Sequence, residues 1–386
     1  MKKTAILTLF YGNYNYGGLL QGYALKKTID ALPESEADIL RYKDGINPIY
    51  SGLRQQMKQY GAKMIVAKII EKGLEKGTFL IQRKIRRRLT LCDAFMEECM
   101  NHDRMEYTDE NIADTLEAYD CYVSGSDQVW NPNCIRNGFL QTFVPERKLK
   151  ISYGASIGRG RLTAKERDTI AHSINTFDYI SVREDDAKNI LQEKVNKEIK
   201  VVLDPVFLPD ISVWDFDTQV NGAEPGKYVL FYSFSDSRRY RKKAEKYCQE
   251  NNLKLLYIPY AKQKLNFFDN TGAGEKLLDV GPKEFVWLIK NARCIFTDSF
   301  HGAAFSILFH KNFFVFERDN KNNSTSMNSR IYNLLDKFHI RDRIICPEYF
   351  PNPEKCSIVY EEINQIIDEY RTDSLEFLRK AMGNKE

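Results

Sequence analysis

A histidine stands at the start of the segment TDSFHGAAFSILF, residues 297–309, where polar residues give way to an apolar run. The chain has only five histidines, and an imidazole can give or take a proton near neutral pH. Ser299 can cap a helix that begins here. The free backbone N–H groups of Phe300, His301 and Gly302 would then favour an anion, and Gly302 leaves room for a ligand. The alternative is a histidine that only caps a buried helix.

An arginine occupies a comparable place in the segment SVRED, residues 181–185. Arg183 follows a strand pattern and precedes a helix pattern, and its planar fork suits a carboxylate or a phosphate. This placement predicts a substrate clamp. The alternative is a structural ion pair with one of the acidic residues that follow, Glu184, Asp185 or Asp186.

A third polar group is the segment SGSDQVWNP, residues 124–132. Trp130 offers a ring that can stack on a sugar. Asp127, Gln128 and Asn131 can hydrogen-bond to sugar hydroxyls. The combination suits carbohydrate, and the alternative is an ordinary turn packed by a tryptophan.

Other polar segments give weaker evidence of a functional site. The loop YGNYNYGG, residues 11–18, lacks the GxGxxG spacing, so a dinucleotide site is not supported. Asp204 in LDP ends a strand pattern, and we interpret it as structural. The sequence has no GxSxG, HExxH or P-loop motif, which leaves hydrolase and kinase functions without support.

The elements that must position these groups alternate between β-branched apolar runs and helical patterns, as in βαβ units around a parallel sheet. A polar stretch near residue 222 separates two such sets. We therefore predict an α/β protein with two Rossmann-like domains and a cleft that receives the carboxyl ends of the strands. The predicted boundaries are 1–210 with a basic helical insertion at about 51–100, 225–350, and a helical tail at 353–386. Predicted strands include 4–10, 37–42, 119–127, 150–156, 179–184, 200–207, 227–234, 253–260, 294–298 and 312–317.

Charge is spread unevenly along the 386 residues. The formal net charge of +4 is too small to indicate nucleic-acid binding. Residues 51–90 carry eleven basic and two acidic side chains, a net charge of +9. A helix with one cationic side there would suit anionic lipid head groups or a pyrophosphate, and the alternative is a solvated helix face.

The eight cysteines form no CxxC pair, which argues against a zinc site and a disulfide framework. The first ten residues do not continue into a signal sequence, and no apolar run reaches the length of a membrane span. We expect reduced thiols, no metal and a cytoplasmic protein, with the basic segment as a hypothetical contact with the inner face of the membrane.

Taken in order, the motifs resemble those of the polysaccharide pyruvyl transferase family. The segments that carry the resemblance are NYNYGGLLQGYAL, VSGSDQVWNP, YGASIG, ISVRE, VVLDPVFL, TDSFHGAAFSILFHK and MNSRI. The resemblance implies a fold similar to that of GT-B glycosyltransferases. It also implies transfer of a pyruvyl group from phosphoenolpyruvate to a sugar of an exopolysaccharide, capsule or cell-wall precursor, as a cyclic ketal and with release of phosphate.

The resemblance places the family's histidine on His301 and its arginine on Arg183. Many relatives have a basic residue shortly before the histidine, where this chain has Ser299 and Phe300. The donor phosphate then needs another cation, and Arg330 or Lys311 can substitute. The expected donor-binding residues are Asp298, Ser299, Phe300, Gly302, Lys311 and Arg330.

Asp127 is expected to act in catalysis on the acceptor side. The expected acceptor-binding residues are Asn15, Gly17, Gly18, Gln21, Ser126, Gln128, Trp130 and Asn131. Phosphoenolpyruvate is a substrate, so no cofactor is implied, and the acceptor is a sugar or a lipid-linked oligosaccharide. The competing functions are a nucleotide-sugar glycosyltransferase on the same fold and a non-catalytic carbohydrate-binding subunit.

Overall fold

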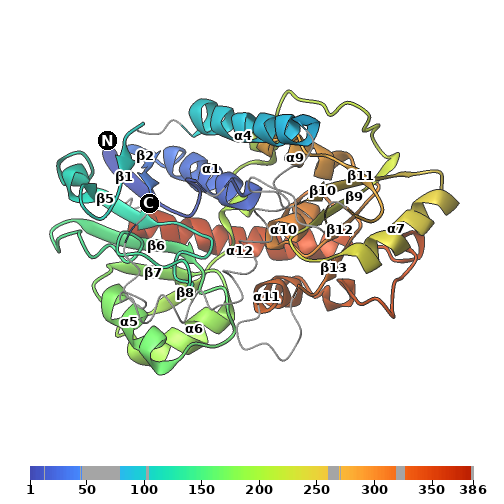
Figure 1. Cartoon of the computed structure of the whole chain (residues 1–386). Coiled ribbons are helices and arrows are strands. Elements are labelled where there is room, and N and C mark those ends of the chain that lie inside the picture. Colours follow the sequence, from blue (N-terminus) through green and yellow to red (C-terminus); the bar gives the residue numbers. More distant parts are fainter. Residues whose placement is uncertain are drawn as a thin grey trace.

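Two parallel β-sheets, each with helices packed against it, make up the protein (Figure 1). The computed structural model describes residues 1–12, 14–43, 45, 79–100, 104–259, 269, 271–318 and 327–383. Every strand pairing in these ranges is parallel. The predicted two-part α/β architecture is confirmed.

The N-terminal sheet has the strand order β2-β1-β5-β6-β7-β8. Its strands are β1 Lys2–Leu7, β2 Ser35–Ile39, β5 Cys121–Ser124, β6 Leu149–Ala155, β7 Tyr179–Val182 and β8 Ile199–Val201. A separate two-stranded ladder joins β3 Arg41–Tyr42 to β4 Glu106–Tyr107. The helices of this half are α1 Tyr16–Asp30, α5 Ala164–Ile174 and α6 Asp185–Leu191.

The C-terminal sheet has the order β11-β10-β9-β12-β13-β14. Its strands are β9 Tyr228–Ser233, β10 Lys254–Pro259, β11 Glu275–Lys276, β12 Cys294–Thr297, β13 Phe313–Phe316 and β14 Ile344–Ile345. Its helices are α7 Arg238–Glu250, α9 Pro282–Asn291, α10 Phe300–Leu308 and α11 Ser329–Lys337.

Two further helices connect the halves. The C-terminal helix α12, Tyr360–Ala381, runs back toward the N-terminal sheet (Figure 1). There Ser374 Oγ accepts a hydrogen bond from Leu203 N at 3.0 Å, and Arg371 Nε donates to Phe207 O at 2.7 Å. Helix α4, Phe79–Cys99, is the described part of the predicted basic insertion and contacts α9. The remainder of that prediction, up to residue 78, lies outside the described residues.

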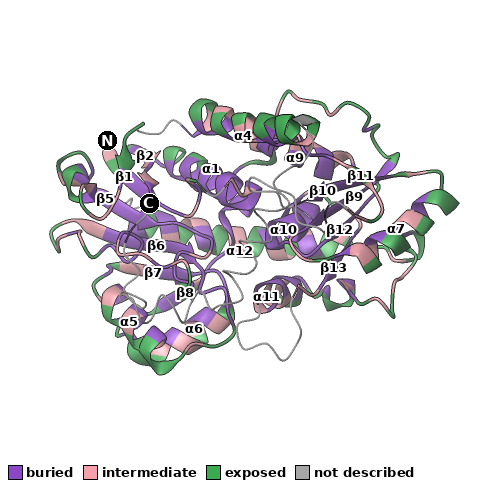
Figure 2. Ribbon diagram, in the orientation of Figure 1, coloured by how far each residue is buried: buried purple, intermediate pink, exposed green. Residues whose placement is uncertain are grey.

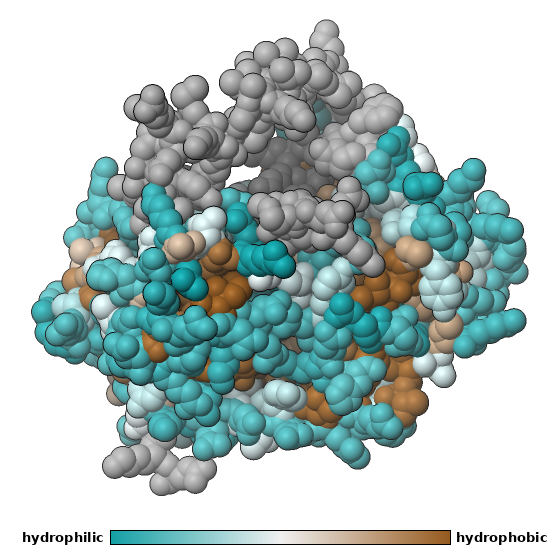
Figure 3. All heavy atoms as spheres, turned by 90° about the horizontal axis from the view of Figure 1, so that it is seen from below, coloured by the Kyte–Doolittle hydropathy of each residue, from teal (hydrophilic) through white to brown (hydrophobic). Residues whose placement is uncertain are grey.

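Burial explains why these segments form a parallel fold. All residues of β5, β9, β12 and β13 are buried, as expected for strands covered on both faces (Figure 2). One face of the surface is mostly hydrophilic, with apolar residues in separate patches (Figure 3). None of the described helices combines the length and the apolar character needed to cross a bilayer.

One predicted strand is wrong over most of its length. The segment 200–207 was expected to be extended, but β8 ends at Val201. Pro205 starts a short 3-10 helix, Pro205–Phe207, and Asp204 caps it by accepting a hydrogen bond from Val206 N at 3.1 Å. The chain therefore turns at Asp204, at the boundary between the two halves.

Candidate active site

His301 lies in the first turn of α10, directly after the carboxyl end of β12. Ser299 caps this helix, as predicted, because its hydroxyl accepts a hydrogen bond from Gly302 N at 3.2 Å. The imidazole is almost fully buried, with 5% of His301 exposed. Gly302 has a packing role rather than an open approach, since a Cβ there would lie 2.5 Å from Thr297 Oγ1.

The start of α1, from the other half of the molecule, covers the imidazole. Asn15 caps α1 by accepting a hydrogen bond from Gly17 N at 2.9 Å. A Cβ built on Gly17 would lie only 2.1 Å from His301 Nδ1, so the ring rests against the helix backbone. The N-termini of α1 and α10 therefore meet at His301. Both present free N–H groups and a positive dipole end, which favour negative charge nearby.

Asp204 holds the opposite edge of the site together. Its Oδ2 atom accepts hydrogen bonds from Arg183 at 2.7 Å and from Ser126 Oγ at 3.2 Å. The same oxygen lies 3.6 Å from His301 Nε2. Burial alone would raise the pKa of the Asp204 carboxyl, but His301 and Arg183 together lower it well below its usual range. The carboxylate is therefore charged and faces the imidazole.

Arg183 was expected to be free to bind a substrate, but its guanidinium is already engaged by carboxylates of the protein. It also donates to Glu184 Oε1 at 2.9 Å, and its guanidinium lies 3.9 Å from the centre of the Phe300 ring. Burial lowers the pKa of Arg183, whereas Glu184, Asp204 and Asp127 raise it above the ordinary value. The structural ion pair with Glu184 that we had considered as an alternative is present. Phe300 contacts this arginine as well.

Further cations lie around this cluster. Arg330, in the first turn of α11, is 5% exposed and lines the same small cavity as Arg183, Asp204, Phe300 and Lys337. The cavity, about 10 Å³, has room for roughly one water molecule. Burial lowers the pKa of Arg330 to about 10, and the positive charges of Arg183 and Arg318 add to this effect. The structure thus brings Arg330 to the site.

Lys311, the other expected substitute, lies elsewhere. It follows the C-terminal end of α10, whereas His301 is in the first turn of that helix. Its backbone carbonyl accepts a hydrogen bond from Tyr360 at 2.5 Å. Nine helical residues span about 13 Å, so Lys311 is on the wrong side to reach an anion beside His301. The expectation for Lys311 is wrong for this geometric reason.

Two expected sugar contacts are in the core instead. Trp130 is fully buried, packs edge-on against Phe177 and donates to Phe139 O at 3.4 Å. Gln21 is also fully buried, and its amide donates to Thr8 Oγ1 and to Gly18 O at 2.7 and 2.9 Å. Neither side chain is available to an acceptor, because tertiary packing occupies both.

Asp298 has a structural role as well. Its carboxylate accepts hydrogen bonds from Phe234 N at 2.8 Å and from Ser235 N and Oγ at 3.0 and 2.6 Å. These hydrogen bonds hold the loop that follows β9. They also engage both carboxylate oxygens of Asp298, which would repel an anionic donor. Asp298 therefore holds the loop after β9 in place, and its expected role in donor binding stays a prediction.

The remaining acceptor candidates are close together. Asn131 donates to Gln128 Oε1 at 2.7 Å, so the two side chains form a pair beside Gly158. Gly18 makes a close backbone approach, because a Cβ there would lie 2.4 Å from Leu9 O and 3.8 Å from Asp127 Oδ2.

Asp127 is the acceptor candidate with an unusual backbone. It has a φ of +66°, which is uncommon for a residue other than glycine and is tolerated best by Asn and Asp. Its carbonyl accepts hydrogen bonds from Ser156 N at 2.9 Å and Val129 N at 2.8 Å. The backbone is thus fixed, and it holds the carboxylate beside the start of α1.

Sequence reasoning missed Asp204, Glu184 and Arg318 as parts of the site. The available signal was their position, since each follows closely on a strand, like His301 and Arg183. Among the described residues, no group of three or more His, Cys, Asp and Glu side chains is placed to hold a metal ion.

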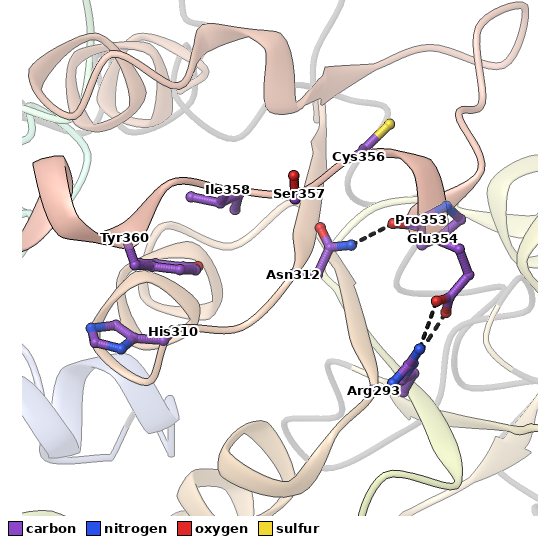
Figure 4. A pocket seen from close by; sticks show the side chains of 9 residues that line it. All are labelled: Arg293, His310, Asn312, Pro353, Glu354, Cys356, Ser357, Ile358 and Tyr360. Carbon is purple, nitrogen blue, oxygen red and sulfur yellow. Dashed lines mark hydrogen bonds and ion pairs between the residues drawn. The ribbon is translucent and has the colours of Figure 1, made fainter.

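A second pocket lies on the C-terminal half (Figure 4). It also contains a histidine, an arginine and a carboxylate, but these groups are already paired. Arg293 donates to Glu354 at 2.6 and 3.1 Å, and His310 Nε2 lies 2.8 Å from Asn364 Oδ1. Asn312 donates to Pro353 O at 2.7 Å. These polar side chains of the pocket therefore already have hydrogen-bond partners within the protein.

The fold and the site define a two-domain α/β protein of the GT-B type. A candidate UDP-N-acetylglucosamine 2-epimerase from Listeria monocytogenes has a similar structure, with a TM-score of 0.54, 10% identity and coverage of 100% of this chain and 97% of its own. A UDP-N-acetylglucosamine 2-epimerase from Rickettsia bellii aligns over 100% of both chains at 11% identity, with a TM-score of 0.42. The first of these likenesses concerns the fold alone.

The sequence profile of the family described as polysaccharide pyruvyl transferase matches residues 15–320. This range covers most of the chain and includes His301, Arg183 and Asp204. The chain therefore belongs to the polysaccharide pyruvyl transferase family, which confirms the resemblance. No curated protein matches the chain significantly.

Proposed function

We propose that the protein transfers the pyruvyl group of phosphoenolpyruvate to a sugar of a surface polysaccharide or its precursor, as a cyclic ketal. The family match supports the reaction class. The observation that carries the proposal is the placement of His301 between two helix N-termini and beside the charged carboxylate of Asp204. The helix ends suit an anionic donor, and the imidazole suits proton transfer.

The chemistry balances with these groups. A proton is added to the methylene carbon of phosphoenolpyruvate, which becomes a methyl group and leaves an oxocarbenium-like centre at C2. Two sugar hydroxyl oxygens form bonds to C2, and the bond from C2 to the phosphate oxygen breaks. The two hydroxyl protons leave the sugar, and in net terms one is on the methyl group and the other on the released phosphate.

In this proposal His301 delivers the proton to the methylene carbon. Asp204 Oδ2 lies 3.6 Å from Nε2 and orients the ring beside the two helix ends, where the anionic donor is proposed to bind. The carboxylates of Asp204 and Glu184 also stabilise the positive charge that develops at C2.

Asp127 and Asn15 are proposed for the acceptor side. Asp127 holds an unusual backbone conformation close to the start of α1, and such conformations are found preferentially at functional sites. Its carboxylate is proposed to accept a proton from a sugar hydroxyl. The Gln128 and Asn131 amides are proposed to bind neighbouring hydroxyls.

The basic face of α4 is proposed to contact the inner face of the membrane. The N-terminal half of α4 carries the exposed residues Arg83, Lys84, Arg86 and Arg87 with no acidic residue among them. Binding to anionic vesicles that weakens steeply with salt is expected if this face meets lipid. Absent or salt-insensitive binding would remove the membrane contact without affecting the proposed reaction.

Ligand protection of the purified protein tests the donor. Phosphoenolpyruvate should raise the unfolding temperature, and UDP- and GDP-sugars should not, since a ligand at 100 times its dissociation constant adds about 2.7 kcal/mol. Phosphate release that requires both phosphoenolpyruvate and a sugar acceptor would complete the test. Protection by a nucleotide sugar alone would indicate a glycosyltransferase. Sugar binding without turnover would indicate a carbohydrate-binding subunit.

A further inference from the structure

Arg330 is an exception among the buried arginines. The described part of the chain contains six of them: Arg88, Arg159, Arg183, Arg241, Arg330 and Arg343. Five have a carboxylate or backbone carbonyl partner: Arg88 with Pro259 O, Arg159 with Glu166, Arg183 with Asp204, Arg241 with Ala273 O and Arg343 with Asp342. Arg330 Nε is buried without a hydrogen-bond partner, and no ion pair of its guanidinium is found among the described residues. A buried charge without a partner is unfavourable unless a ligand supplies one.

A second cation with spare donors lies nearby. Arg318 follows β13, and its buried Nε also lacks a hydrogen-bond partner within the described ranges. Its backbone N–H donates to Asn328 Oδ1 at 3.0 Å, which ties it to the start of α11, two residues before Arg330. Its Nη2 atom donates to Asp298 O at 3.0 Å and lies 3.7 Å from Asp298 Oδ1, and its guanidinium lies 4.4 Å from the centre of the Phe234 ring. Arg318 is therefore held in place, and the Nε groups of both arginines remain unused as donors among the described residues.

The start of α11 adds to this positive region. Asn328 precedes the helix but gives it no side-chain cap, because its oxygen is used by Arg318 N. The free N–H groups of the first turn and the dipole of this nine-residue helix favour an anion. Arg183 is less suited to such a role, since Glu184 and Asp204 already accept from it at 2.9 and 2.7 Å.

We propose that Arg330 and Arg318, with the N-terminus of α11, form the subsite for the phosphate group of the substrate. Arg183 is then a positioning residue, which orients Asp204 against His301 and does not bind the phosphate. The identity of the phosphate as that of phosphoenolpyruvate rests on the proposed function, whereas the subsite itself does not.

Calorimetric titration of the full chain with inorganic phosphate at constant ionic strength tests the subsite. Arg330→Met should weaken phosphate binding by about 10- to 150-fold, the range expected for hydrogen bonds to a charged group. Without ligand, the same variant should unfold at an equal or higher temperature than the wild type, since it removes an uncompensated buried charge. A structural arginine would show the opposite. Arg341→Met, an exposed arginine beyond α11, is the matched control and should leave phosphate affinity unchanged.

Two results would overturn the subsite: no saturable phosphate binding by the wild type, or unchanged phosphate affinity in a folded Arg330→Met protein. If Arg330→Met does not fold, Arg318→Met is tested instead. We expect it to weaken phosphate binding by at least about tenfold. Unchanged phosphate affinity in Arg318→Met would count against the proposal.

Parallel titrations with phosphoenolpyruvate and UDP separate the subsite from the proposed function. If UDP rather than phosphoenolpyruvate binds through Arg330, the subsite stands and the pyruvyl donor is wrong. If phosphoenolpyruvate is turned over equally well by Arg330→Met, the proposed function stands and the subsite is wrong.

Discussion

The interdomain cluster and the pocket of Figure 4 contain the same kinds of side chain in different surroundings. His301, Arg183 and Asp204 have side chains that are 6%, 3% and 1% exposed. In the other pocket, Arg293 and Glu354 are 52% and 40% exposed and bind each other. Solvent screens that pair, so it contributes little. Buried groups that are close but incompletely paired mark the interdomain cluster as the site where a ligand has most to contribute.

The largest expected difference concerns the two histidines. His301→Asn should lower the rate of phosphate release from phosphoenolpyruvate with the sugar acceptor by about 10²- to 10⁴-fold, the usual contribution of a general acid or base. His310→Asn is the matched control, because asparagine tolerates the φ of +52° at that position and His310 lies in the pocket of Figure 4. Its rate should stay within about twofold of the wild type.

Steady-state rates of both variants, with circular dichroism to verify folding, check this prediction. Near wild-type phosphate release by a folded His301→Asn protein would show that the proton comes from another group. An equal loss of phosphate-release rate in both variants would mean that burial and incomplete pairing do not distinguish the active site from the pocket of Figure 4.

The next difference concerns the two carboxylates. Asp204→Asn removes a buried charge that Arg183, Ser126 and His301 face, and it should lower the free energy of unfolding at pH 7 by about 3 kcal/mol. Glu354→Gln, at the half-exposed pair with Arg293, should cost at most about 1 kcal/mol. Urea denaturation of both variants measures the difference, and equal losses would contradict it.

The same pair of proteins gives a pH test. The folded-state pKa of Asp204 is lowered, so its contribution to stability is fully present above its unfolded pKa of about 3.9 and is lost as the pH falls through the lowered value. The difference in unfolding free energy between wild type and Asp204→Asn should therefore shrink as the pH falls below about 4. A difference that grows on acidification would show that the carboxyl pKa is raised instead.

The sequence predicted where the site lies better than how its members interact. Strand exits at Arg183 and His301 were visible as apolar runs that end in polar residues, and each parallel sheet gathers such exits at its own carboxyl edge. The pairing of Arg183 with Asp204 was not visible, since Asp204 is 21 residues away, three residues beyond the end of the neighbouring strand β8. Trp130 was misassigned because a polar turn does not reveal that its one aromatic ring points inward.

The boundary of α1 illustrates the same limit. The sequence indicated a loop over residues 11–18, but the helix begins at Tyr16 because Asn15 caps it. Residues 16–18 are therefore helical and include Gly17, which contacts His301 from the other half of the molecule. Helix ends depend on capping and tertiary contacts, so apolar periodicity places them less well than helix interiors.

The smallest expected effect, and the most specific, concerns two glycines of α1. A Cβ at Gly17 would lie 2.1 Å from His301 Nδ1, so Gly17→Ala must displace the ring or separate the two halves, at a cost of about 1 to 3 kcal/mol. At Gly22 the nearest atoms are at 3.4 Å, an ordinary contact, and Gly22→Ala should be neutral or slightly stabilising because alanine favours helix. Thermal unfolding and phosphate-release rates of both variants give the comparison. Because a displacement of about 1 Å can cost about 100-fold in rate, Gly17→Ala should lose more activity than its modest loss of stability explains. Equal behaviour of the two variants would mean that the α1 backbone does not position His301.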